Sequence, residues 1–129
     1  SQDACLLGDI SYHHFEGIAV SLEEKKTLVK DLGPKNKIMM LHNHGVLTAG
    51  ETIAEAFMWM YWLDKACQSQ IMALSAVGGD KSKLHVLPES MRKKVGQQYI
   101  DTFTKAGLGT CEFAALKRQL EACNQFFKK

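Results

Sequence analysis

One histidine stands where a strand-like segment meets a glycine-assisted bend. His44 comes three residues after the apolar stretch 37–41, and it precedes Gly45 and a second short apolar run at 46–48. A neutral imidazole at the end of a buried strand is a suitable ligand for a divalent metal ion. His44 is therefore the first candidate metal ligand of the chain.

A second histidine, His42, precedes His44 by two residues. Side chains at i and i+2 of a strand project from the same face, so the two imidazoles would lie side by side. Zinc sites use three or four protein ligands, so two histidines do not make a site. The alternative is a strand histidine hydrogen-bonded to a neighbour. Other possible ligands are His13, His14, Glu16 and Glu51, none of them at a diagnostic spacing. We expect His13 and His14 in a turn at the surface, with a polar role.

Composition excludes several classes of function. The chain of 129 residues is 46% hydrophobic and 23% charged, as in globular domains, and its net charge of +2 is too small for a nucleic-acid surface. No apolar run is long enough to span a membrane, and the first residues lack the pattern of a signal peptide. The four cysteines show no C-x-x-C spacing, which favours reduced thiols. These features predict a cytoplasmic protein without membrane insertion or nucleic-acid binding.

Capping and turn signals divide the chain into strands and helices. Helix starts are indicated by the capping boxes Ser21–Glu24 and Thr52–Glu55. Strands are expected at 17–20, 37–43 and 46–49, with a weaker candidate at 9–12. Helices are expected at 21–32 and 52–77. A third helix runs from Pro88 to the glycines at 107–109, and a fourth follows these glycines. This order predicts an α/β fold with about four helices on a small sheet. The sheet is small for these helices, which suggests part of a larger domain or a core completed by partner chains.

Seven consecutive large apolar side chains occupy residues 57–63 of the long helix. At about 100° per residue they point all the way round it. One interpretation is an internal helix that is covered by the chain's own sheet and helices. The other places Trp59 or Trp62 against a neighbouring subunit.

The residues 8–17, GDISYHHFEG, resemble the G-x-x-x-Y-H-D-[YF]-x-G segment of the class II aldolase/adducin family. The same pattern continues in order through 32–37, 43–52, 55–57 and 65–71. The resemblance is good over roughly residues 1–80 and loose after that. It implies the three-layer αβα fold of that family, with residues 1–129 as the C-terminal portion of one domain and its N-terminal part absent.

In the catalytic branch of this family, three histidines hold zinc or a related divalent ion. The resemblance makes His44 the third of these ligands, while the first two, an H-x-H pair, and the acid/base carboxylate lie upstream. His42 is not at a family ligand position. Tyr12 lies in the segment that donates a catalytic tyrosine to a neighbouring subunit of a cyclic tetramer. His14 replaces the family's usual aspartate. With one ligand of three, these 129 residues are expected to bind metal weakly and to be inactive.

The resemblance leaves open whether the protein is an enzyme. One hypothesis is a metal-dependent aldolase-type lyase that cleaves a sugar phosphate or a related hydroxy-carbonyl compound. The other is an adducin-like head domain that self-associates and binds the actin/spectrin cytoskeleton. The last residues, Phe126–Lys129, show no basic tail of the adducin kind. The presence of His44, the third family ligand by resemblance, favours metal binding and therefore the lyase hypothesis.

Overall fold

The computed structural model describes residues 1–17, 22–103 and 107–124. The elements run in the order α1 (Gln2–Leu6), β1 (Ser11–His13), α2 (Leu22–Leu32), β2 (Ile38–Leu41), β3 (Gly45–Thr48), α3 (Ile53–Ala76), the 3-10 turn η1 (Lys81–Lys83), α4 (Glu89–Phe103) and α5 (Thr110–Cys123). The α/β class is confirmed. The short helix α1 was not expected, and the predicted strand at 17–20 falls mostly outside the described residues.

The three strands form a mixed sheet in the order β1-β2-β3. β1 and β2 are parallel and are joined by a crossover that contains α2, whereas β2 and β3 are antiparallel neighbours across a tight turn. β2 is the central strand, and its first two side chains are fully buried on opposite faces of the sheet: Ile38 and Met39. The sheet is therefore covered on both sides at this point.

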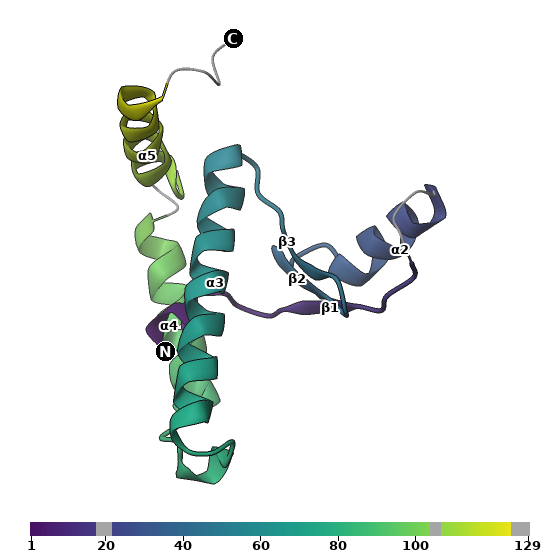
Figure 1. Ribbon diagram of the computed structural model, residues 1–129, viewed down its shortest axis with the longest axis vertical. Coiled ribbons are helices and arrows are strands. Elements are labelled where there is room, and N and C mark those ends of the chain that lie inside the picture. Colours follow the sequence, from purple (N-terminus) through teal and green to yellow (C-terminus); the bar gives the residue numbers. More distant parts are fainter. Residues whose placement is uncertain (18–21, 104–106, 125–129) are drawn as a thin grey trace.

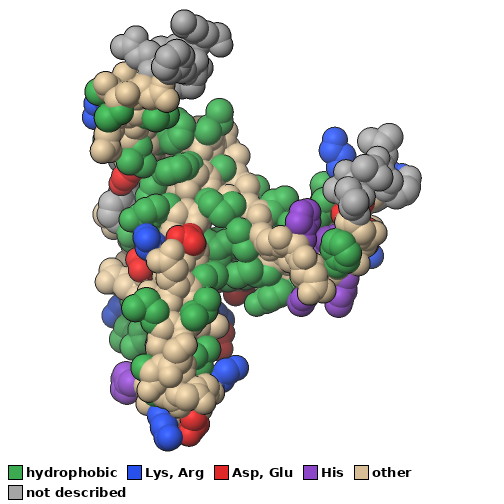
Figure 2. Space-filling model, in the orientation of Figure 1, with side chains coloured by type: hydrophobic (Ala, Val, Ile, Leu, Met, Phe, Trp, Pro, Cys, Tyr) green, Lys and Arg blue, Asp and Glu red, His purple; other side chains and the backbone are tan. Residues whose placement is uncertain are grey.

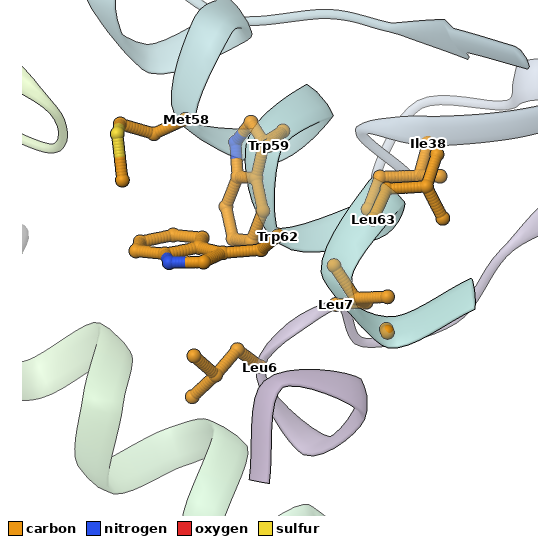
Figure 3. Packing of buried hydrophobic residues seen from close by; sticks show 8 residues of the cluster. Leu6, Leu7, Ile38, Met58, Trp59, Trp62 and Leu63 are labelled. Carbon is orange, nitrogen blue, oxygen red and sulfur yellow. The ribbon is translucent and has the colours of Figure 1, made fainter. Parts of the chain in front are cut away.

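The two faces of the sheet pack on different helices (Figure 1). On one face, the Ser11 hydroxyl donates to the carbonyl of Leu32 at 3.0 Å, which fixes the end of α2 against β1. On the other face, Ile38 joins a core cluster with Leu63 of α3 (Figure 3). Layers of helix, sheet and helix result, as the family resemblance implied.

Helix α3 begins where its capping box predicted. The Thr52 hydroxyl accepts from the Glu55 amide at 3.1 Å, and Thr52 has the extended backbone of a helix cap. The Glu55 carboxylate closes the box one residue earlier than the usual pattern, because it accepts from the amide of Glu51 at 2.7 Å. The helix ends at Ala76, just before the glycine pair that was expected to stop it.

Both tryptophans of α3 lie in the chain's own core. Trp59 and Trp62 are each 8% exposed, and their rings meet edge to face at a centroid distance of 5.5 Å (Figure 3). The prediction that one of them faces a neighbouring subunit is therefore wrong. The helix is not buried on every side either, because Phe57 and Tyr61 remain 38% and 48% exposed.

Glycines allow two close approaches between helices. A Cβ on Gly96 of α4 would contact the carbonyl oxygen of Cys5 in α1 at 2.8 Å. A Cβ on Gly109, just before α5, would collide with the Ala54 carbonyl and the Met58 side chain of α3. Gly109 also has a φ of 75°, a conformation that costs other residues free energy. These two positions fix α4 and α5 beside α1 and α3.

Much apolar surface remains uncovered in the part of the chain that the structure describes (Figure 2). Ile71 and Met72 near the end of α3 are 64% and 72% exposed. Helix α5 also leaves apolar side chains open, since Leu116 and Leu120 are 45% and 50% exposed. No helix among the described residues is long and apolar enough to cross a membrane.

Candidate functional site

His44 lies in the turn between β2 and β3, not on a strand. β2 ends at Leu41, two residues earlier than expected, and the His44 amide donates to the Leu41 carbonyl at 3.1 Å. Asn43 supplies the left-handed conformation of the turn, with a φ of 55°. The strand argument that placed His42 and His44 on one face is therefore wrong. The imidazole of His44 is exposed at the bend that the sequence indicated.

Three exposed aromatic rings lie in a row across β1 and the turn. The rings of Tyr12 and His42 are tilted at a centroid distance of 5.8 Å, and those of His42 and His14 are stacked at 5.3 Å. Figure 2 shows histidine atoms gathered around the sheet and α2. The His42 ring, in the turn after β2, thus contacts rings at the end of β1. The His42 amide also donates to the His13 carbonyl at 2.9 Å.

His13 is buried, contrary to the expectation of a polar surface role. It is 3% exposed, and its Nδ1 lies 2.8 Å from Oδ2 of Asp31 in α2. An ionised carboxylate only accepts hydrogen bonds, so Nδ1 carries the proton and donates. No local motif announces this pair, because the two residues are 18 positions apart and meet only when α2 packs on β1.

Four histidines line one small cavity of about 40 Å³: His13, His14, His42 and His44. His13 forms part of its buried wall, whereas the other three are exposed. Glu16 also lines this cavity. The structure therefore brings together most of the sequence-predicted ligand candidates.

The other two candidates are elsewhere. Tyr12 lines a separate groove of about 830 Å³, which runs between the sheet, α3 and residues 84–87. Glu51 lines a third hollow of about 530 Å³ beside the start of α3. Tyr12 and His44 thus do not share a cavity within one chain.

The donor groups do not fit a complete metal site. Within residues 1–17, 22–103 and 107–124, no three His, Cys, Asp or Glu side chains are placed to hold one metal ion. The four cysteines are all free thiols, and Cys111 and Cys123 are exposed, not packed. At least three protein ligands are needed for a zinc site, so His44 is at most one contributor.

A carboxylate network beside the 530 Å³ hollow was not foreseen. Glu55 accepts a hydrogen bond from the Trp59 indole at 3.2 Å and forms an ion pair with Lys37 at 3.7 Å. Partial burial, the largest single influence, raises the pKa of Glu55. The Glu51 amide, the Trp59 indole and Lys37 together outweigh it and lower this pKa below its ordinary value. Glu55 therefore stays ionised and ties the helix start to the sheet.

Comparison with known proteins gives the site its family context. Residues 1–71 match the family described as Class II Aldolase and Adducin N-terminal domain. The chain is 35% identical to alpha-adducin of Mus musculus over 127 residues, which cover 94% of this chain and 17% of that protein. It is 44% identical to a putative aldolase class 2 protein of Caulobacter vibrioides over 93 residues, 70% of this chain and 35% of that protein.

Two solved structures resemble the fold. An aldolase II superfamily protein from Pseudomonas syringae has a TM-score of 0.76 and 34% identity, over 96% of this chain and 48% of that chain. An L-fuculose 1-phosphate aldolase from Glaciozyma antarctica PI12 has a TM-score of 0.59 and 28% identity, over 76% of this chain and 34% of that chain. The chain thus spans less than half the length of each of these relatives.

Proposed function

Because the chain belongs to the class II aldolase/adducin family, we propose that it is the C-terminal portion of a divalent-metal-dependent aldolase-type lyase. The substrate is a sugar phosphate or a related hydroxy-carbonyl compound. The observation that carries this proposal is the exposure of His44 at the rim of the histidine-lined cavity. The family resemblance makes this residue the third metal ligand. Likeness to an L-fuculose 1-phosphate aldolase supports the substrate class.

The rest of the metal site is proposed to come from polypeptide that precedes these residues in a longer protein. The resemblance assigns only His44 as a metal ligand, and the described residues do not form a three-ligand group. The metal is expected to be zinc. The 129 residues by themselves are expected to be inactive.

Tyr12 is proposed as the proton donor for a neighbouring subunit's site. Its side chain is 60% exposed, and it faces a different hollow from His44. A tyrosine so exposed is open to contact with a partner chain. The proposed assembly is a homo-oligomer, a tetramer by family resemblance, in the cytoplasm.

Activity in a longer family protein that contains these residues tests the proposal. We expect retro-aldol cleavage of a ketose phosphate such as L-fuculose 1-phosphate, lost with a chelator and restored by zinc. His44→Ala is expected to reduce kcat/KM by more than about 100-fold, because loss of an outer-shell partner of a metal ligand already costs about 10–100-fold. His85→Ala, a histidine outside the 40 Å³ cavity, is the matched control. No cleavage of any sugar phosphate or related hydroxy-carbonyl compound by the zinc-loaded protein would refute the lyase proposal.

A second candidate is an adducin-like head domain without catalysis. The observation in its favour is coverage: the adducin matches extend over 94% of this chain, and that of the putative aldolase over 70%. Such a protein would self-associate and bind the actin/spectrin cytoskeleton. Cosedimentation of the same longer protein with actin filaments and spectrin tests it: binding without lyase activity supports the scaffold, and cleavage without binding supports the enzyme.

A further inference from the structure

The buried ring of His13 has one nitrogen paired and one unpaired. Nδ1 donates to Asp31 at 2.8 Å, whereas Nε2 has no hydrogen-bond partner within the described residues although it is fully buried. Buried polar atoms in folded proteins are nearly always paired, so an orphaned imidazole nitrogen calls for a partner that the described residues do not supply. His13 also lines the cavity of about 40 Å³, which makes this cavity the candidate position of the partner.

The Asp31 carboxylate decides which kind of partner this is. Because Nδ1 carries the proton, Nε2 of the neutral ring presents a lone pair and accepts a hydrogen bond. A carboxylate, or a phosphate ester in its dianionic form, offers no donor and does not satisfy this atom. A charged ammonium group would have to lose its hydration beside a neutral acceptor, which is unfavourable. A hydroxyl group supplies the donor without a charge.

We propose that His13 Nε2 is the acceptor of a hydroxyl subsite, which takes the terminal hydroxymethyl group of a hydroxy-carbonyl compound into the 40 Å³ cavity. The rim residues His14, His42 and His44 admit the ligand, and Asp31 holds the ring in the accepting tautomer. A single water needs about 10–15 Å³ on this measure, so the cavity of about 40 Å³ has room for a small group such as a hydroxymethyl. His13 is here a binding residue. The inference rests on the proposed function for the ligand class and adds to it a site that sequence reasoning did not foresee.

Nitrogen NMR of the histidine rings in the 129-residue protein tests this subsite without any turnover. At about pH 8, where free imidazole is neutral, we expect His13 to show a protonated Nδ1 and an unprotonated Nε2. Titration with dihydroxyacetone is expected to shift the Nε2 resonance to saturation. Acetone, which has the carbonyl but no hydroxyl, is expected to bind at least about tenfold more weakly.

A matched pair of variants assigns the effect to one atom. His13→Asn keeps an amide donor near the position of Nδ1, for the bond to Asp31, but removes Nε2. It is expected to weaken dihydroxyacetone binding about tenfold, read from backbone amide shifts around the cavity. His85→Asn makes the same change away from the cavity and is expected to bind like the wild type.

Three results would overturn the subsite. These are a protonated Nε2 in the wild-type protein, equal shifts with dihydroxyacetone and acetone, or a long-lived water on Nε2 that dihydroxyacetone does not displace. The first depends on the wild type alone, so it decides the matter even where His13→Asn does not fold. Because no metal or catalysis is involved, a negative result leaves the lyase proposal standing, and failure of lyase activity leaves this binding result intact.

Discussion

At the scale of single residues, the pair of His13 and Asp31 joins the site to the fold. The imidazole is almost fully buried, and the carboxylate is about one third exposed. The pair ties α2 to β1 beside the cavity. It also sets the tautomer of the ring, so stability and chemistry depend on the same hydrogen bond.

Replacing Asp31 by alanine should therefore destabilise the fold. The Nδ1–H of His13 loses its acceptor inside the protein, which costs about 1–3 kcal/mol. Urea denaturation measures the change in the free energy of unfolding. Asp64→Ala is the control, because the Asp64 carboxylate accepts an exposed hydrogen bond from the Gln68 amide at 2.7 Å, and we expect a change within about 0.5 kcal/mol. An equal decrease in the free energy of unfolding in the two variants would show that the buried pair stabilises the fold no more than an exposed hydrogen bond does.

Glu55 gives a prediction about pH. Its pKa is lowered in the folded protein, so the ionised form stabilises the fold above the ordinary carboxyl range. That contribution is lost as the pH falls through the lowered pKa. The stability difference between wild type and Glu55→Gln should shrink between about pH 7 and about pH 3, as followed by urea titrations at each pH. A difference that grows on acidification would mean that burial dominates and the pKa is raised.

Residue chemistry was only partly predictable from the sequence. The bend at His44 and the cap at Thr52 follow from local signals, because glycine and short polar side chains act on their own neighbours. His13 could not be placed in the same way. Its burial depends on Asp31, which approaches only through the crossover between β1 and β2.

At the scale of elements, α3 is the central support of the molecule. Its two tryptophans, with Leu63 and Ala66, form one wall of the core, and Ile38 of β2 packs against them (Figure 3). The helix thus fixes β2, and β2 leads directly into the turn that carries His44.

A pair of substitutions on adjacent residues of α3 tests this packing. Trp62→Ala removes an indole that is 8% exposed and should lower the free energy of unfolding by about 3–5 kcal/mol. Tyr61→Ala, 48% exposed on the other side of the helix, should cost less than about 1 kcal/mol. Thermal and urea denaturation give both values. A stable Trp62→Ala protein that only changes its state of association would place Trp62 at a subunit interface instead.

The contact between α5 and α3 depends on Gly109. Gly109→Ala should cost clearly more than the roughly 1–2 kcal/mol of a left-handed alanine, because its Cβ would collide with the backbone of Ala54. Gly78→Ala is matched, since Gly78 has a φ of 61° and open space around its Cα. We expect Gly109→Ala to lose α5 protection in hydrogen exchange, and Gly78→Ala to keep it. Similar exchange in both would mean that α5 does not rest on α3 in solution.

Element order was more predictable than burial. The positions of α2, α3, β2 and β3 follow from capping residues and apolar runs within about two residues. Leu116 and Leu120 of α5 are spaced four residues apart, as in a buried helical stripe, yet they are 45% and 50% exposed. A stripe tells which face seeks a partner, and it does not tell whether these residues supply one.

At the scale of the whole molecule, the surface is large for the mass. The accessible area is 9701 Å² for a chain of 14.4 kDa, whereas compact monomers of this mass expose about 6,800 Å². The groove that includes Tyr12 and Ile71 is part of this excess. An open face of this kind agrees with the proposal that these residues complete their core with further polypeptide of the same family domain.

Zinc binding to two forms of the protein tests this account most directly. Isothermal titration and atomic emission would compare the 129 residues with a longer family protein that adds the preceding segment. We expect weak, substoichiometric zinc in the first, one tightly bound zinc per chain in the second, and loss of that zinc in His44→Ala. Tight stoichiometric zinc on the 129 residues alone, or full retention without His44, would contradict the assignment of His44 as one ligand of a site completed from outside.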